Sequence, residues 1–137
     1  MIVGVDIGTQ SLKAVVVTPA LEVLGQHSVA YRPEFPEPGW AHQDPRLWED
    51  ALRPAIEGAL HAANCRAGQV TALGIAGQLD GCIPVDGEGL PLHPCLIWMD
   101  RRAEAELAGI DARLIQERCG LVLDATHLAA KIRWLKR

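Results

Sequence analysis

The sequence predicts a mixed α/β fold, and three observations support this. Three segments rich in apolar and β-branched residues open the chain, "MIVGVDIG", "LKAVVVTP" and "EVLGQHSVAY", with short links between them. Apolar residues at helical spacing follow over 47–63. A further apolar stretch, "QVTALGIAG" at 69–77, comes after that helix. Short links favour antiparallel pairs, and a strand reached through a helix is typical of a mixed sheet.

The first half of the chain predicts three strands, a loop and a helix. The third strand, 22–31, alternates loosely and is expected to be half-buried, whereas 32–44 carries three prolines and predicts a loop. Asp44 is expected to cap the helix, with Pro45 in its first turn. An interior proline, Pro54, predicts a kink near 50–54 or a start later than Asp44. The apolar face should contain Leu47, Trp48, Ala51, Leu52, Ile56, Ala59, Leu60 and Ala63.

The second half predicts one buried strand, a hairpin and three short helices. The strand over 69–77 is expected to be buried on both faces, because nearly every residue in it is apolar or small. "GCIPVD" and "PCLIW" flank "GEG" and predict a hairpin. Residues 101–120 predict two short helices and 126–137 a last one. The buried side of that last helix should contain Leu128, Ala129, Ile132 and Leu135.

Composition indicates one globular domain in the cytoplasm. The chain has 137 residues, of which 49% are hydrophobic, and a net charge of -4. These values exclude disorder, and without a long basic run they argue against a nucleic-acid or membrane surface. No apolar run reaches the roughly 20 residues of a membrane span. The first residues lack the charged region of a signal peptide, so an address outside the cytoplasm is not expected.

The four cysteines, Cys65, Cys82, Cys95 and Cys119, show no CxxC spacing. Without a secretory signal we expect reduced thiols, and small buried side chains in particular. A zinc site is a second interpretation.

The stretch "VDIGTQSLKAVV" places polar residues at a bend between two apolar segments. Gly8 lets a ligand approach the backbone, while Thr9, Gln10 and Ser11 offer polar groups and turn amides that suit an anion. Asp6 could hold Mg²⁺ through water or accept a bond from a substrate hydroxyl. The neighbouring Lys13 could lie on either face of its strand. The alternative interpretation is a decorated hairpin turn.

Two further polar groups follow apolar runs. "GQLDG" places Gln78 and Asp80 at the end of a strand, where α/β sheets position ligand groups. "IWMDRR" ends in Asp100, Arg101 and Arg102, and a carboxylate with a guanidinium suits sugar hydroxyls. The alternative is a turn aspartate before a glycine in the first case. In the second it is a helix cap followed by solvated arginines, an interpretation that covers Arg102.

Taken together, these motifs resemble the FGGY carbohydrate kinases. "DIGTQSLKAVV", "PGWAHQDPRLW", "GIAGQLDG", "VDGEGLPLHPCLIWMDRRA" and "THLAAKIRWLKR" occur in the order and spacing of that family, nearest to its xylulokinase-like branch. The resemblance covers essentially the whole chain. It implies an incomplete ribonuclease-H-like, actin-type ATPase domain. It also implies ATP-dependent phosphorylation of a primary hydroxyl of a ketose or polyol, with Mg²⁺.

The resemblance also implies roles by position. The segment Asp6 to Ser11 resembles the first phosphate loop, which faces the γ-phosphate and the metal, with Asp6 holding Mg²⁺ through water. Gln78, Leu79 and Asp80 match the segment that lines the sugar pocket, and Asp100 with Arg101 matches a second segment near it. Trp40 and Gln43 fall in a loop expected to be structural. No histidine falls on a catalytic position, and His61 and His127 are expected on helix surfaces.

The chain departs from the family pattern in two ways. Leu79 and Asp80 stand where xylulokinases usually have Met-His, and an ionised aspartate only accepts hydrogen bonds, so the resemblance does not assign D-xylulose. Family members are several-fold longer. They supply the catalytic aspartate later in the first domain and bind adenosine in a second domain. We therefore expect residues 1–137 to be the N-terminal portion of domain I, inactive alone, with uncovered apolar faces that favour self-association or a homodimer.

Two other hypotheses remain open. One is an actin-fold module that binds sugar or phosphate without catalysis. The other is a non-sugar phosphotransferase or ATPase on the same fold, against which "GQLDG" and "IWMDRR" argue because they resemble the sugar side.

Overall fold

A computed structural model describes residues 1–137 and divides the chain into two units. The first unit comprises Met1–Pro33 and Pro45–Gln78, and the second comprises Glu34–Asp44 and Leu79–Arg137. Each unit therefore contains residues from two separate stretches of the sequence.

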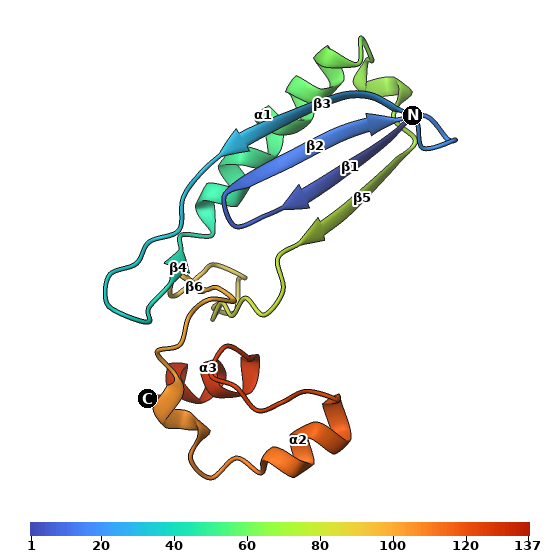
Figure 1. Ribbon diagram of the computed structural model, residues 1–137. Helices are drawn as coiled ribbons and strands as arrows, with labels where there is room; N and C mark the ends of the chain where they lie inside the picture. The colour runs from blue at the N-terminus through green and yellow to red at the C-terminus, as the bar shows by residue number, and fades with distance from the viewer. The chain divides into compact units, whose positions relative to one another are not determined.

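The first unit is a four-stranded mixed sheet with one long helix, as predicted (Figure 1). Its strands are β1 Ile2–Ile7, β2 Ser11–Val17, β3 Val23–Ala30 and β5 Ala72–Gly77, and its helices are α1 Arg46–Ala62 and the short 3₁₀ turn η1 Ala67–Gln69. The strand order is β3-β2-β1-β5. The first three strands pair antiparallel, whereas β5 joins β1 in parallel.

The core of the first unit is apolar and lies between α1 and the sheet. Alternate residues of β1 and β2 point into it because strand side chains alternate between the two faces. The helix contributes small residues, which lets it approach the strands closely. The fully or nearly buried members are Val3, Val5, Leu12, Ala14, Val16, Ala51, Ala55 and Ala59. The predicted apolar face of α1 is confirmed, and Ala55 belongs to it as well.

Glycine permits a close backbone approach in this unit. A Cβ added to Gly25 of β3 would lie 2.4 Å from the backbone nitrogen of Ala63, just after α1. No real side chain tolerates such a distance, so β3 and the end of α1 can only meet at a glycine.

The start of α1 differs slightly from the prediction. The helix begins at Arg46, and Pro45 before it already has helical angles, φ −59° and ψ −25°. Pro45 is therefore the N-cap residue, and Asp44, which was expected there, lies one residue before it. The helix thus starts two residues later than Asp44 and runs through Pro54 to Ala62. Pro54 lies on the exposed side, where water can bond the carbonyl that lacks an amide partner.

The two edge strands are more exposed than predicted. In β3 only Gly25 and Val29 are half-buried. All of β5 is exposed, with Leu73 at 54% and Ile75 at 59%, so the prediction of a strand buried on both faces is wrong. The reason is tertiary: α1 packs on β2 and β3 and does not extend over β5.

The second unit contains two short strands and three helical segments. They are β4 His42–Gln43, β6 Cys95–Leu96, η2 Glu104–Leu107, α2 Ala112–Cys119 and α3 Leu128–Leu135. The pairing of β4 with β6 is antiparallel, and β4 lies inside the predicted loop. Isolated bridges join Cys82 to Leu96 and Val85 to Pro91, which confirms the hairpin direction around "GEG".

The ends of α2 follow local chemistry. The Asp111 carboxylate accepts hydrogen bonds from the amides of Arg113 and Leu114 at 2.9 and 3.2 Å, which caps the first turn. Gly120 ends the helix in a left-handed conformation, φ 69°.

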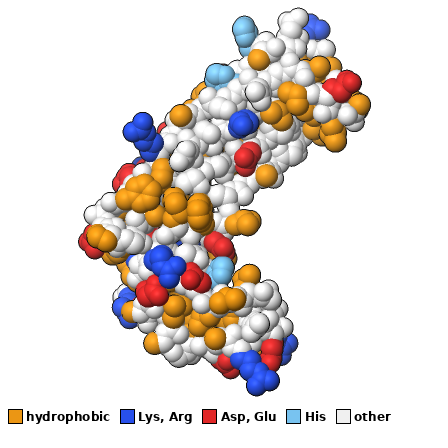
Figure 2. All heavy atoms as spheres, in the orientation of Figure 1, with side chains coloured by type: hydrophobic (Ala, Val, Ile, Leu, Met, Phe, Trp, Pro, Cys, Tyr) orange, Lys and Arg blue, Asp and Glu red, His pale blue; other side chains and the backbone are white.

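The last helix, α3, presents a different face from the one predicted. Leu128 and Ile132 are 43% and 49% exposed, whereas Ala130 and Lys131 are buried. Hydrophobic side chains are accordingly visible on the surface of this unit (Figure 2). Its exposed large hydrophobic residues include Leu114, Leu121, Val122, Leu128 and Ile132. Cys82 and Cys95 are buried as expected, but Cys119 is exposed. None of the helices combines the length and apolar character that a membrane span requires.

Candidate functional site

The bend between β1 and β2 is a tight, tethered turn. The Gly8 amide donates to the Ser11 carbonyl at 3.0 Å, and a Cβ on Gly8 would lie 3.0 Å from the same oxygen. Tyr31 holds the turn from outside: its hydroxyl donates to the Gly8 carbonyl at 2.7 Å and its amide to the Gln10 carbonyl at 3.0 Å. The shape of residues 8–11 is therefore set by tertiary bonds as well as by local sequence.

Tyr31 stays a donor over a wide pH range. Burial, and to a smaller extent the charge of Asp6, raises the pKa of its phenol to about 12. The hydroxyl is consequently protonated at every pH where the protein is expected to work, and the bond to Gly8 persists.

Asp6 and Lys13 lie opposite each other on adjacent strands and share one face of the sheet. Together with Gly4, Gly74 and Ala76 they line a hollow of about 410 Å³. A Cβ added to Gly74 would meet nothing within 4 Å, so the hollow is open at this position. The sequence left the side of Lys13 undecided, and the structure places it beside Asp6.

The turn also touches the first residue of the predicted sugar segment. Thr9 Oγ1 donates to Gln78 Oε1 at 3.2 Å, and the Gln78 amide donates to the Ile7 carbonyl at 3.0 Å. The contact arises because β1 and β5 are parallel, so their carboxyl ends meet at the same edge of the sheet. The sequence separation of 69 residues hides this contact from any local pattern.

In the second unit, Asp80 adopts an unusual backbone. Its φ is 53°, in the left-handed region that few residues other than glycine and asparagine or aspartate occupy. Its carbonyl accepts from Lys131 Nζ at 2.6 Å, and its Oδ2 pairs with His127 Nδ1 at 3.3 Å. The Asp80 side chain is 35% exposed, and the adjacent Leu79 is 79% exposed. The predicted segment thus presents its carboxylate at the surface of its unit.

Asp100 is completely buried, and both of its carboxylate oxygens accept hydrogen bonds. Its Oδ2 accepts from the Ala41 amide at 2.7 Å, and its two oxygens accept from Arg102 Nε at 3.0 and 2.9 Å. In this structure it binds protein groups, which makes it a residue that positions its neighbours.

The two arginines after Asp100 have opposite environments. Arg102, expected to be solvated, is 1% exposed: its guanidinium lies 3.9 Å from the centre of the Trp40 ring and 5.1 Å from that of Trp134. Arg101 is 46% exposed and pairs with Glu104 and Asp124. The expectation of a solvated Arg102 is therefore wrong, because two aromatic rings and a buried carboxylate enclose it. The structural role of Trp40 fits this enclosure.

Lys131 is the main residue that sequence patterns missed. It is completely buried and donates to the carbonyls of Asp80 and Ile97 at 2.6 and 2.8 Å. Desolvation lowers the pKa of its amine, and the carboxylates of Asp100 and Asp80 oppose that shift. A lysine amid apolar helix residues gives no signal of burial, since lysines are almost always exposed. His127, expected on a helix surface, is 27% exposed and also contacts Asp80, which the sequence did not indicate.

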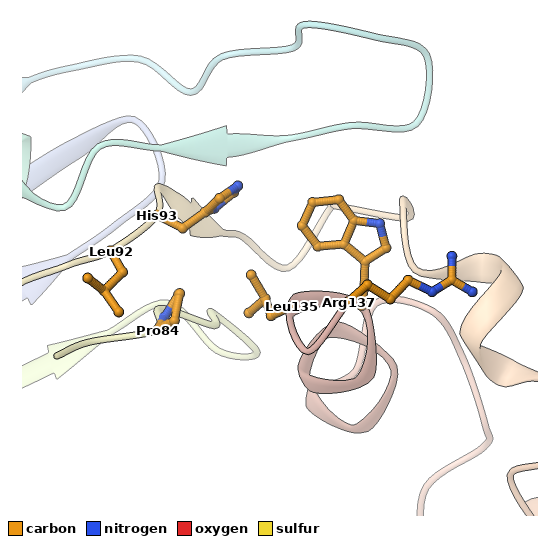
Figure 3. Close-up of a pocket in the computed structure, with 6 residues that line it drawn as sticks. Pro84, Leu92, His93, Leu135 and Arg137 are labelled. Atoms are coloured by element: carbon orange, nitrogen blue, oxygen red, sulfur yellow. The ribbon is translucent and has the colours of Figure 1, made fainter.

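A separate hollow lies in the second unit, beside α3 (Figure 3). It measures about 500 Å³ and is mostly apolar, and the six residues that line it are Pro84, Leu92, His93, Trp134, Leu135 and Arg137. The Arg137 guanidinium pairs with Glu106 at 2.8 Å. None of the predicted site residues lines this hollow.

Comparison with known proteins identifies relatives along the whole chain. Residues 1–137 match the FGGY family of carbohydrate kinases, N-terminal domain. A glycerol kinase of Thermococcus onnurineus is 34% identical over 138 residues, covering 98% of this chain and 28% of the relative. A xylulose kinase of Staphylococcus xylosus is 31% identical over 140 residues with the same coverage.

Solved structures agree. A crystal structure described as a xyloylose kinase from Brucella ovis matches with a TM-score of 0.92 and 32% identity, covering 98% of this chain and 29% of that one. The xylulose kinase from Rhodospirillum rubrum matches with a TM-score of 0.89 and 28% identity, covering 98% and 28%.

These matches confirm the predicted fold class, the ribonuclease-H-like, actin-type ATPase fold, here as a partial domain. The chain spans about 28% of the length of the curated relatives it matches. Their sequences align with it from the first strand to the last helix. The chain belongs to the FGGY family of carbohydrate kinases and matches the N-terminal domain of that family throughout.

Proposed function

We propose that this chain is the N-terminal segment of an ATP-dependent carbohydrate kinase that phosphorylates a primary hydroxyl of a polyol or ketose. The observation that carries the proposal is the bond from Thr9 Oγ1 to Gln78 Oε1. It joins the turn that resembles a phosphate loop to the first residue of the segment that resembles a sugar-binding one. A decorated hairpin turn has no need of such a link.

On the phosphate side, Asp6, Gly8, Thr9, Gln10 and Ser11 are the proposed contacts to ATP. Turn amides and hydroxyls suit phosphate oxygens, and Gly8 keeps the backbone accessible. The residues also fit Mg²⁺, which is usually bound through one or two carboxylates, waters and substrate phosphates. Asp6 is exposed, and the space beside Gly74 in the same hollow is open, so a hydrated metal has room there. When bound, the metal would neutralise charge on the phosphates.

On the sugar side, Gln78, Leu79 and Asp80 are the proposed contacts. Asp80 suits the role because its carboxylate is partly exposed and accepts hydrogen bonds from hydroxyls. Arg101, half-exposed, can also donate to a hydroxyl. Asp100 is better suited to holding the loop, since both of its oxygens are already bonded to Arg102. That the phosphate and sugar segments face one crevice stays a prediction.

Relatives suggest which substrates to try. Matching proteins are described as glycerol kinases, xylulose kinases and a gluconate kinase. We propose small polyhydroxy compounds of this kind as acceptors, with the catalytic aspartate and most of the nucleotide site outside residues 1–137. On this proposal the 137-residue chain alone releases no ADP. A cytoplasmic location and self-association stay predictions.

A coupled ADP-release assay over glycerol, D-xylulose and gluconate, run on the longest protein that the gene encodes, tests the proposal. Binding of a sugar or phosphate without ADP release would favour the non-catalytic module.

Within that assay, Asp6→Ala should abolish turnover, because it removes the proposed metal and phosphate contact. It should leave thermal unfolding unchanged, since Asp6 is exposed. Asp50→Ala, which removes an exposed carboxylate from α1 of the same unit, is the matched control and should leave kcat unaffected. Near-normal kcat in Asp6→Ala would refute the role.

A further inference from the structure

We propose that His127 and Lys131 are positioning residues that hold Asp80 for the acceptor, so that α3 sets which acceptor binds. The inference rests on the proposed function, because it concerns the same acceptor segment. Lys131 fixes the backbone of Asp80, and His127 orients its carboxylate. Neither residue is predicted to touch the transferred phosphate.

The backbone of Asp80 has an external hold. A φ of 53° is less favourable for aspartate than for glycine, and contacts with neighbouring groups stabilise it. The contact here is strong: Lys131 Nζ lies 2.6 Å from the Asp80 carbonyl oxygen. The same amine lies 2.8 Å from the Ile97 carbonyl, so Lys131 ties Asp80 to the residue that directly follows β6.

The burial of Lys131 shows that this hold is built in. A lysine side chain is almost never fully buried unless it is paired, and this one has 0% exposure. Its partners are two backbone carbonyls, which need specific placement to satisfy it. An apolar residue in place of Lys131 would leave both carbonyls without this hydrogen-bond donor.

His127 acts on the side chain. It is the N-cap residue of α3, yet it makes no side-chain capping bond to its own helix. Its Nδ1 instead lies 3.3 Å from Asp80 Oδ2, 47 residues earlier in the sequence. Histidine is not a favoured capping residue, so the local helix gives no reason for it here. Its contact with Asp80 does.

The pair lies at the surface of its unit, as an acceptor-binding group must. The side chains of His127 and Asp80 are 27% and 35% exposed. With Oδ2 held by the imidazole, the carboxylate keeps one orientation while the exposed part can accept a bond from an acceptor hydroxyl. Loss of the imidazole would free the carboxylate to rotate, which weakens acceptor binding without touching the ATP contacts.

Kinetics of the full-length enzyme test this division. We expect His127→Ala to raise the KM of the acceptor about tenfold, because the Asp80 carboxylate loses one hydrogen bond. The KM of ATP should stay unchanged. His127→Asn should restore it, because the asparagine amide can donate from nearly the same place as Nδ1. His61→Ala, at an exposed histidine of α1, is the matched control and should change neither constant.

A double-mutant cycle shows whether His127 acts through Asp80. If it does, His127→Ala should add little to Asp80→Ala, because the group it orients is already gone. Additive effects, or an equal rise in both KM values, would overturn the proposal.

A readout without turnover separates this inference from the proposed function. In amide NMR spectra of the full-length protein, His127→Ala should shift the Asp80 and Gly81 signals, and His127→Asn should leave them close to wild type. Signals that stay unchanged in both variants would overturn the positioning role. If no acceptor is phosphorylated while these shifts occur, the proposed function fails and the hold on Asp80 stands.

Discussion

The two units are built on different interiors. In the first, the buried residues are aliphatic side chains and small alanines, such as Leu12 and Ala55, together with Tyr31. In the second, four polar residues are buried as well: Gln43, Asp100, Glu106 and Lys131. The first unit therefore depends on shape and the second on hydrogen bonding. Hydrophobic patterning is a guide to the first kind of interior only, which is why the core prediction succeeded for α1 and failed for α3.

The difference has energetic consequences. Removing part of an apolar side chain from a core costs about 1–5 kcal/mol, graded by the volume lost. Removing one partner of a buried ion pair costs about 3–5 kcal/mol, because a charge is left without compensation. The second unit should therefore respond more abruptly to single substitutions than the first. Trp48 lies in the first unit, and Trp40, Trp98 and Trp134 in the second, so single-tryptophan variants can report on each.

The largest effect is expected at Arg102. Arg102→Ala leaves the buried Asp100 carboxylate without its guanidinium and should lower the free energy of unfolding by about 3–5 kcal/mol. Arg101→Ala, one residue away, removes two exposed ion pairs and should have a much smaller effect, because water screens exposed charges. Urea unfolding followed by the tryptophans of the second unit provides the measurement. Similar losses of unfolding free energy in both variants would contradict the idea that the second unit depends on its buried polar residues.

A smaller effect is expected at Gly25. Gly25→Ala places a methyl group 2.4 Å from a backbone atom of Ala63 and should destabilise the first unit by about 1–3 kcal/mol, since backbone must move. Gly74→Ala, in β5, meets nothing within 4 Å and should be close to neutral. Thermal unfolding of the two variants, monitored through the fluorescence of Trp48, compares the tightly packed glycine of β3 with the uncovered glycine of β5. A neutral Gly25→Ala would mean that α1 and β3 pack less closely.

The smallest effect is a difference in alkaline sensitivity. Burial raises the pKa of the Cys95 thiol from its usual 9.0 to about 11. Between those values the folded state keeps a proton that the unfolded state has lost, so the free energy of unfolding falls as pH rises. Tyr31 in the first unit has its pKa raised from 10.0 to about 12, so the same loss begins at higher pH. As pH rises, the free energy of unfolding of the second unit should therefore begin to fall before that of the first.

Urea midpoints across this alkaline range, for wild type and Cys95→Ser, check the order. The serine variant should lose part of the pH dependence in the second unit, since serine does not titrate there. An unaltered slope in Cys95→Ser would assign the effect to other groups.

Parts of the candidate site were accessible to sequence reasoning. The turn at Gly8 and the polar ends at Gln78 and Asp80 stand out because each interrupts or ends an apolar run. Arg101 and Arg102 look equivalent in sequence, and patterning could not tell which one is buried. The partners of Asp80, His127 and Lys131, are 47 and 51 residues away and carry no local signal.

The sequence by itself determined the order of strands and helices in the first unit, the mixed sheet, the apolar face of α1 and the family. These follow from short-range periodicity and from motifs that keep their spacing. Only the tertiary structure decided that β5 is exposed, that α3 turns Lys131 inward, and that Thr9 meets Gln78. The physical reason is that burial and pairing of a residue depend on which segments, distant in sequence, pack against it. Sequence patterns indicate which interactions each residue is able to make, whereas the fold determines which residues become its neighbours.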